Sequence, residues 1–175
     1  MRIGDSGVPY FVIRAGIKMI TEAKVRELIE GKVEADGYFI VEVSVSAGND
    51  IRIVVDSENG VPISYCEEID ALVETSLNRD EEDYSLEVSS AGIGTELKVM
   101  GQFMKNIGNK VEVTMPNGAW VRGVLVSADE EGFEIETEEK RKVETESGKK
   151  VNQIVKETHR YERKDIRSVK DIVEF

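Results

Sequence analysis

The sequence contains few cysteine, histidine, proline and aromatic residues. Its 175 residues include one cysteine, Cys66, and one histidine, His159. A single cysteine permits no intrachain disulfide, which suits a reducing compartment, and these two residues cannot complete a four-ligand zinc site. No stretch approaches the roughly 18 apolar residues of a membrane helix. These absences argue against a disulfide-stapled secreted domain, a zinc domain and a membrane-spanning protein.

The first 18 residues contain an apolar stretch that differs from a signal peptide. Asp5, Pro9 and Arg14 interrupt its apolar residues, and no small-residue cleavage site follows. A helical pattern begins at Met19. We therefore expect residues 1–18 to be a non-structural extension and the protein to be cytoplasmic.

The charge is distributed unevenly along the chain. The net charge is −12, yet residues 19–92 hold 18 acidic and 5 basic side chains, whereas residues 108–175 hold 15 and 13. Residues 140–170 have 11 basic and 5 acidic side chains. This asymmetry fits an acidic surface for a basic partner and a mildly basic surface for an anionic one, or charged faces that only maintain solubility.

The pattern of residues 19–92 predicts an αββαβ domain. Apolar residues recur at helical spacing over 20–33 after a candidate N-cap, Thr21, and the alternating strands 37–45 and 51–56 form a hairpin. Ser64 and Glu67 are spaced as a capping box for a second helix, with Cys66 facing inward, and 84–89 form a third strand. Two helices packed on a three-stranded sheet would bury these faces.

Residues 93–107 form the predicted interdomain joint, and residues 108–175 predict an all-β domain. Short strands at 111–115, 120–128 and 133–137 are separated by the turns "PNG" and "DEEG". A small closed barrel would remove the exposed edges of such strands. Residues 140–153 are almost free of apolar side chains and predict a charged loop. The fold class is therefore α+β.

The segment "EVSSAGIGTELKV" resembles no complete phosphate or nucleophile motif. Gly92 and Gly94 match the start of G-x-G-x-x-G, but Leu97 replaces the third glycine, and neither a P-loop nor a G-x-S-x-G elbow is present. His159 lies among charged residues far along the chain. No enzyme site, metal site or cofactor is therefore expected.

Three further residues permit two interpretations each. Asp56 follows a strand and can accept backbone amides of the next turn, or less plausibly bind a metal. Cys66 is expected to be a small buried hydrophobe rather than a reactive thiol. Trp120, with Arg122 nearby, is either a core residue, which is commoner in small barrels, or a base-stacking platform.

Four segments resemble the bacterial ribosome maturation factor RimP family in the same order along the chain. They are 51–70, 84–93, 107–113 and 123–137, and the likeness extends over about 19–175. The most specific matches are Asp56, Gly60, Cys66 and the segment from Leu86 to Gly92, which includes Ser89 and Ser90. The family commonly has S-P-G followed by L-D-R-P-L, so Ala91, Thr95 and Glu96 are departures, and the joint should be more flexible unless packing fixes it.

The resemblance implies an N-terminal α/β domain and a C-terminal SH3-like barrel similar to Sm-type folds. It also implies a role in assembly of the small (30S) ribosomal subunit, with free small subunits, 16S rRNA near the central pseudoknot and the basic ribosomal protein uS12 as partners. Neither a membrane nor a small-molecule substrate is implied.

From charge alone, eight side chains are candidates for rRNA contact: Lys110, Arg122, Lys149, Lys150, Arg160, Arg163, Lys164 and Arg167. The competing hypothesis is a protein-only adaptor whose barrel binds a peptide and does not touch RNA.

Overall fold

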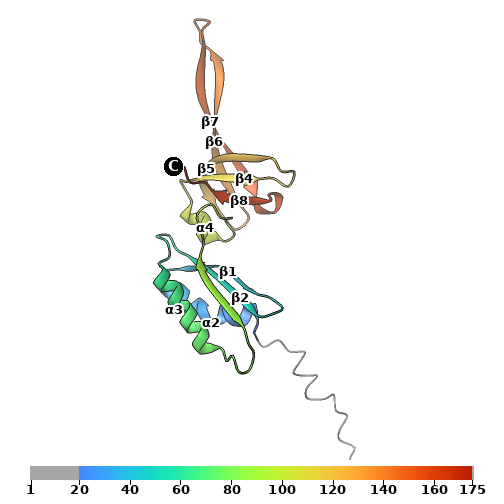
Figure 1. The fold of residues 1–175 in the computed structure, drawn as a ribbon. Helices are drawn as coiled ribbons and strands as arrows, with labels where there is room; N and C mark the ends of the chain where they lie inside the picture. Colours follow the sequence, from blue (N-terminus) through green and yellow to red (C-terminus); the bar gives the residue numbers. More distant parts are fainter. Residues whose placement is uncertain (1–19, 175) are drawn as a thin grey trace, which may run out of the picture. The chain divides into compact units, whose positions relative to one another are not determined.

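The computed structural model describes residues 20–174, and these form an α+β fold with three α-helices and two sheets of three and five strands (Figure 1). The described chain separates into two compact units. The first contains residues up to Val55 together with 61–89, and the second contains 56–60 and the chain from Ser90 onward. The extension expected at 1–18 lies outside the described residues. The boundaries 19–92, 93–107 and 108–175 stay predictions.

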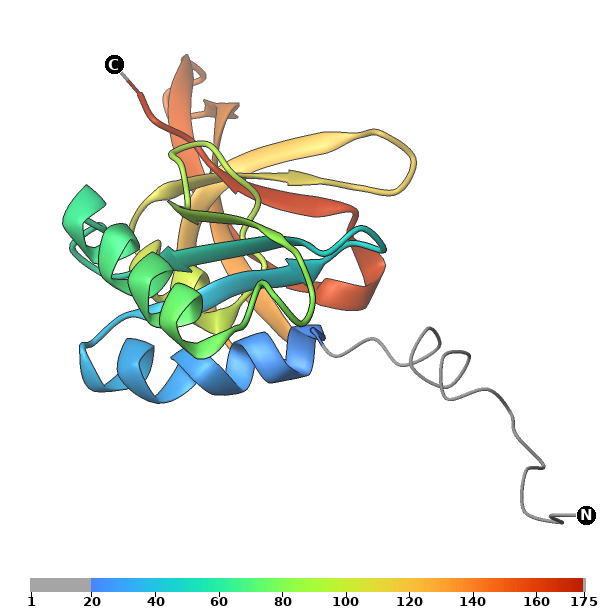
Figure 2. The same ribbon diagram turned by 60° about the horizontal axis from the view of Figure 1, so that its bottom comes forward.

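The first unit has the predicted order of elements. It contains α2 (Glu22–Ala35), β1 (Phe39–Val45), β2 (Asp50–Asp56), α3 (Ile63–Ser76) and β3 (Ser85–Ser90), with β2 in the centre of the sheet. The predicted N-cap is confirmed, since the Thr21 side chain accepts a hydrogen bond from the Lys24 N–H at 3.2 Å. Helices α2 and α3 lie side by side against the sheet (Figure 2), and their apolar stripes bury the alternating residues of β2.

Helix α3 begins differently from the prediction. Pro62 occupies the N-cap with no side-chain hydrogen bond, so the capping box of Ser64 and Glu67 is wrong. Pro62 fixes an extended entry, and the helix starts two residues earlier than the box requires. As a result Tyr65 enters the core and stacks on the Tyr38 ring at 3.7 Å, while Cys66 is only half-buried.

The second unit is a five-stranded antiparallel sheet with a short helix. Its elements are α4 (Met100–Lys105), β4 (Lys110–Thr114), β5 (Trp120–Ala128), β6 (Gly132–Glu144), β7 (Lys150–Glu162), the 3-10 helix η1 (Arg163–Asp165) and β8 (Ser168–Asp171). The strand order is β7-β6-β5-β4-β8. Phe103 from α4 packs on Phe133, Leu125 and the inward residues of β4 and β8 to form a separate core.

The closed SH3-like barrel is not confirmed, because no pairing among the described residues joins the end strands β7 and β8. Strand β5 does cross β6 closely. A Cβ on Gly123 would lie 2.6 Å from the carbonyl oxygen of Glu136, so only glycine fits at this crossing. The register between β5 and β6 then shifts between Leu125 and Ser127, which is a bulge.

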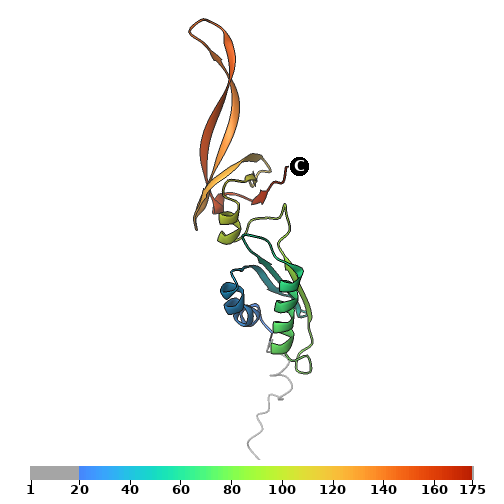
Figure 3. The same cartoon turned by 90° about the vertical axis from the view of Figure 1, so that its left-hand side faces the viewer.

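The segment 140–153, for which the sequence predicts a long charged hairpin loop, is a hairpin, but strands occupy most of it. Strands β6 and β7 pair without interruption from Gly132 opposite Glu162 to Glu144 opposite Lys150, and Gly148 with φ +76° closes the tight turn (Figure 3). Backbone ladder hydrogen bonds hold this hairpin, and they need no apolar side chain. Composition alone therefore did not indicate these strands.

Packing fixes the second half of the predicted joint within the second unit. The buried Leu97 donates its N–H to the Val169 carbonyl at 2.8 Å, and Gln102 of α4 accepts from the Lys98 N–H at 2.7 Å. Gly94 has φ +74°, a left-handed conformation that favours glycine, whereas Gly92 has no positive φ. Of these two glycines, only Gly94 therefore has a backbone angle that other residues rarely adopt.

Candidate nucleic-acid interface

Three of the predicted RNA-contact cations are paired with carboxylates. Lys110 lies 2.7 Å from Glu174, and Arg122 of β5 lies 2.8 Å from Glu112 of β4. Arg160 of β7 contacts both Asp129 at 2.9 Å and Glu162 at 3.0 Å. These neighbours raise the pKa of the Arg160 guanidinium. Carboxylates that occupy these cations would compete with a phosphate, so we rank these three below the unpaired cations.

Arg163 has a structural role inside the second unit. Its guanidinium lies 4.3 Å from the centre of the Phe103 ring and donates to the Met100 sulfur at 2.9 Å. Its Nε is buried and has no hydrogen-bond partner within 20–174. A cation over an aromatic face is favourable, and this one covers the end of the core.

Arg163 and Arg167 line one side of a pocket of about 260 Å³ in the second unit. Phe103, Leu97 and Ile166 form its apolar wall. The backbone N–H of Arg167 donates to the Thr114 carbonyl at 2.8 Å, while its side chain is exposed and forms no ion pair with any described residue. Arg167 therefore keeps its charge available in the lining of this pocket.

Several cations of the second unit have no carboxylate partner among the described residues, and four of them, Lys140, Lys142, Lys149 and Lys150, lie on the β6–β7 hairpin. Lys149, Lys150 and Lys164 are exposed and have no ion pair with any described residue. The same is true of Lys140 and Lys142, which the sequence analysis counted in the local charge but did not select. Their alternation in "KRK" was the available signal, because alternate residues of a strand face the same side.

Trp120 is exposed, with 61% of its surface accessible. The commoner interpretation of Trp120 as a core residue is therefore wrong. It begins β5 beside the Met115–Ala119 turn, where the Met115 N–H donates to the Ala119 carbonyl at 2.7 Å. The Arg122 guanidinium lies 4.8 Å from its ring centre. An exposed indole next to an arginine has the composition of a base-stacking platform.

The family-motif residues around Asp56 form a compact turn. The carboxylate of Asp56, which is 5% exposed, accepts the Ser57 N–H at 2.8 Å, so a backbone amide does bond to it as the turn interpretation expected. The Ser57 hydroxyl donates to the Gly60 carbonyl at 2.6 Å, and Gly60 has φ +87°. Within the second unit, the Nζ of Lys105 in α4 donates to the two carboxylate oxygens of Asp56, at 2.9 and 3.1 Å.

The remaining motif residues have less to offer a ligand. Burial raises the pKa of the Cys66 thiol, which keeps it in the less reactive protonated form. Ser89 and Ser90 end β3, and the Gly92 carbonyl accepts a hydrogen bond from the Thr95 hydroxyl at 2.6 Å.

The described residues contain no group of three or more potential metal ligands. Among its described helices, none is long and apolar enough to cross a membrane.

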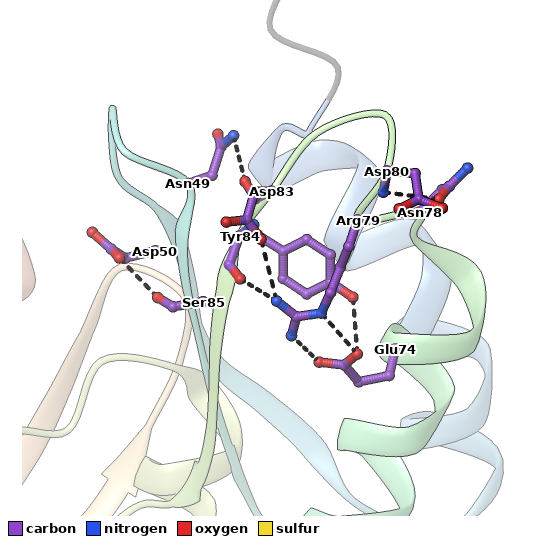
Figure 4. Close-up of polar contacts among 9 residues, drawn as sticks. All are labelled: Asn49, Asp50, Glu74, Asn78, Arg79, Asp80, Asp83, Tyr84 and Ser85. Carbon is purple, nitrogen blue, oxygen red and sulfur yellow. Dashed lines mark hydrogen bonds and ion pairs between the residues drawn. The ribbon is translucent and has the colours of Figure 1, made fainter.

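The first unit presents an acidic loop after α3, at residues 78–83. Arg79 organises it by pairing with Glu74, donating to the Tyr84 carbonyl at 2.6 Å and stacking 4.1 Å from the Tyr84 ring centre (Figure 4). Asn49 holds the other side by donating to the Asp83 carbonyl at 3.1 Å. The Arg79 hydrogen bond lowers the pKa of Glu74. This ordered loop leaves its outer carboxylates exposed.

Comparison with known proteins gives matches to ribosome maturation factor RimP sequences. A family model described as the RimP N-terminal domain matches residues 28–94. A protein of Christiangramia forsetii named ribosome maturation factor RimP is 36% identical over 108 residues, which cover 61% of this chain and 70% of that protein. A protein of the same name from Porphyromonas gingivalis is 33% identical over 118 residues, which cover 67% of this chain and 78% of that protein. The protein of this name from Flavobacterium psychrophilum is 36% identical over 96 residues, which cover 54% of this chain and 62% of that protein.

Proposed function

Because the chain belongs to the ribosome maturation factor RimP family, we propose that it is a ribosome maturation factor. In this proposal it assists assembly of the small (30S) subunit by binding immature particles without catalysis. Its partners are free small subunits rather than translating ribosomes.

We propose that each unit binds a different partner. The second unit would contact 16S rRNA through its unpaired cations, with Trp120 as a stacking surface for an unpaired base. The first unit would bind a basic small-subunit protein, with uS12 as the candidate, through its acidic face. The observation that carries the proposal is that Lys140, Lys142, Lys149 and Lys150 lack acidic partners in the described chain, although the whole chain is acidic.

A sedimentation experiment tests this function. Full-length protein is mixed with free small subunits, immature small-subunit particles and assembled ribosomes, and its distribution is followed through a gradient. We expect it to sediment with the first two and not with assembled ribosomes. Equal association with assembled ribosomes would overturn the assembly role. Binding to a ribosomal protein without any binding to rRNA would instead favour the protein-only adaptor.

A further inference from the structure

The outer part of the β6–β7 hairpin, residues 138–156, is a two-stranded ribbon with no third strand. Strand β5 pairs with β6 only as far as Val124 opposite Glu136, whereas β6 and β7 continue to pair to Glu144 opposite Lys150 (Figure 3). At about 3.3 Å per residue, seven further residues extend the ribbon by roughly 23 Å. Such a ribbon contributes little to the core, so its purpose is not packing.

The two faces of the ribbon differ in chemistry. Alternation and register put Lys140, Lys142 and Lys150 on one face, together with Asn152, Ile154 and Glu144, which lies directly opposite Lys150. The opposite face has Val143 directly across from Val151. The lysines therefore form a single-sided row, which we call the lysine face.

The cations of the ribbon differ in whether they form an ion pair with a carboxylate of the described chain. Closer to the sheet, Lys156 contacts Glu136 at 3.0 Å and Glu138 at 3.3 Å. On the opposite face, Arg141 contacts Glu139 and Glu157. Lys140, Lys142 and Lys150 have no such contact among residues 20–174. The ribbon thus pairs Lys156 and Arg141 with carboxylates and leaves Lys140, Lys142 and Lys150 without an ion pair for an anionic partner.

The composition of the ribbon also indicates which kind of RNA it suits. Residues 138–156 contain no phenylalanine, tyrosine, tryptophan or histidine. Recognition of unpaired bases normally uses aromatic stacking, whereas double-helical RNA is bound through its shape and its phosphates. A row of lysines on one face of a narrow ribbon matches the second mode.

We propose that the lysine face of the β6–β7 ribbon binds along the phosphate backbone of a double-helical rRNA segment. This inference rests on the proposed function and deepens it, because it names the element and the form of RNA. The contact is electrostatic and independent of base sequence. Log K for a duplex falls linearly with the logarithm of the salt concentration. Each phosphate that a lysine neutralises makes this slope steeper by roughly 0.9.

The test measures binding of full-length protein to a fluorescent 20-base-pair duplex from 16S rRNA and to a single strand of the same length. The variants are Lys140→Gln/Lys142→Gln/Lys150→Gln, the single Lys140→Gln, and Lys156→Gln as the control. Lys140→Gln and Lys156→Gln each remove one charge from the same face, but only Lys156 is paired with carboxylates. Circular dichroism checks that each variant folds.

We expect the triple variant to bind the duplex roughly tenfold more weakly at 100 mM salt and to lose about 3 from the salt slope. Lys140→Gln should lose more affinity than Lys156→Gln. Unchanged duplex binding by the triple variant would overturn the inference. So would equal losses in the two single variants, or a triple variant that loses as much affinity for the single strand as for the duplex.

Sedimentation of the triple variant with small subunits separates this inference from the proposed function. A wild type that fails to sediment with free or immature small subunits contradicts the function itself. If the wild type sediments and the triple variant sediments equally well, the function stands and the role of the lysine face is wrong.

Discussion

The Arg122 guanidinium lies 4.8 Å from the centre of the Trp120 ring while its Nε donates to Glu112 at 2.8 Å. The carboxylate holds the arginine and the arginine covers part of an otherwise exposed indole. Because the chain has one tryptophan, its fluorescence reports on the second unit alone.

Trp120 fluorescence should report RNA binding. We expect an emission maximum typical of an exposed indole, and quenching when a single-stranded fragment of 16S rRNA stacks on the ring. Trp120→Ala should weaken single-strand binding by about 1 to 3 kcal/mol, with little change in the free energy of unfolding. Unquenched emission at saturating RNA would contradict the stacking role.

The ion pair between Asp56 and Lys105 should stabilise the second unit. Asp56 is 5% exposed, so Lys105→Met leaves a buried carboxylate without its cation. We expect a loss of about 2 kcal/mol in the free energy of unfolding, between the values for surface and fully buried pairs. Urea denaturation measures it.

A double-mutant cycle with Asp56→Asn should give a coupling of about 1 kcal/mol. Lys164→Met is the control, because Lys164 is exposed and unpaired in the described chain, and it should change stability by less than about 0.5 kcal/mol. A Lys105 variant as stable as this control would refute the structural role of the pair.

Two glycine-to-alanine substitutions should have opposite effects. Gly123→Ala puts a Cβ 2.6 Å from the Glu136 carbonyl oxygen, so we expect a loss of about 1 to 3 kcal/mol. Gly31 lies within α2 with open space around it, and Gly31→Ala should stabilise by roughly 0.5 to 1 kcal/mol. Thermal unfolding of both variants provides the measurement. Destabilisation by Gly31→Ala would show that α2 is packed differently.

The pairing of Glu74 with Arg79 should make stability depend on pH in the acidic range. The arginine holds the folded pKa of Glu74 below the usual value of about 4.3, so the unfolded chain binds this proton first on acidification. The stabilisation is complete above that value and is lost as the pH falls through the lower folded pKa. Glu74→Gln should therefore be less stable than wild type at pH 7, and the difference should shrink at pH 3.

Glu81→Gln serves as the matched control for Glu74→Gln, since Glu81 is exposed in the same acidic loop. Urea midpoints at both pH values are compared. If both variants follow the same pH profile, general charge repulsion rather than the Arg79 pair explains the effect.

The parts of the fold that the sequence predicted well depend on local patterns. Thr21 caps α2 because its hydroxyl reaches a nearby backbone N–H, and the strand alternation of Ile51, Ile53 and Val55 continues into the buried centre of the first sheet. Both signals lie within a few residues and need no tertiary information.

The parts that were missed depend on distant partners. The ribbon at 138–156 looked like a loop because its strands are held by pairing with each other rather than by an apolar face. Trp120 looked like a core residue because exposure depends on where the turn beside it points. Which cations were neutralised could not be inferred either, since Arg160 meets Asp129 across 31 residues of sequence.

Crosslinking of full-length protein to immature small subunits tests the central claim most directly, with every crosslinked nucleotide and peptide identified. We predict crosslinks from the second unit to 16S rRNA and from the first unit to a basic ribosomal protein, and none to assembled ribosomes. Crosslinks confined to ribosomal proteins, or the same crosslinks on assembled ribosomes, would contradict the account.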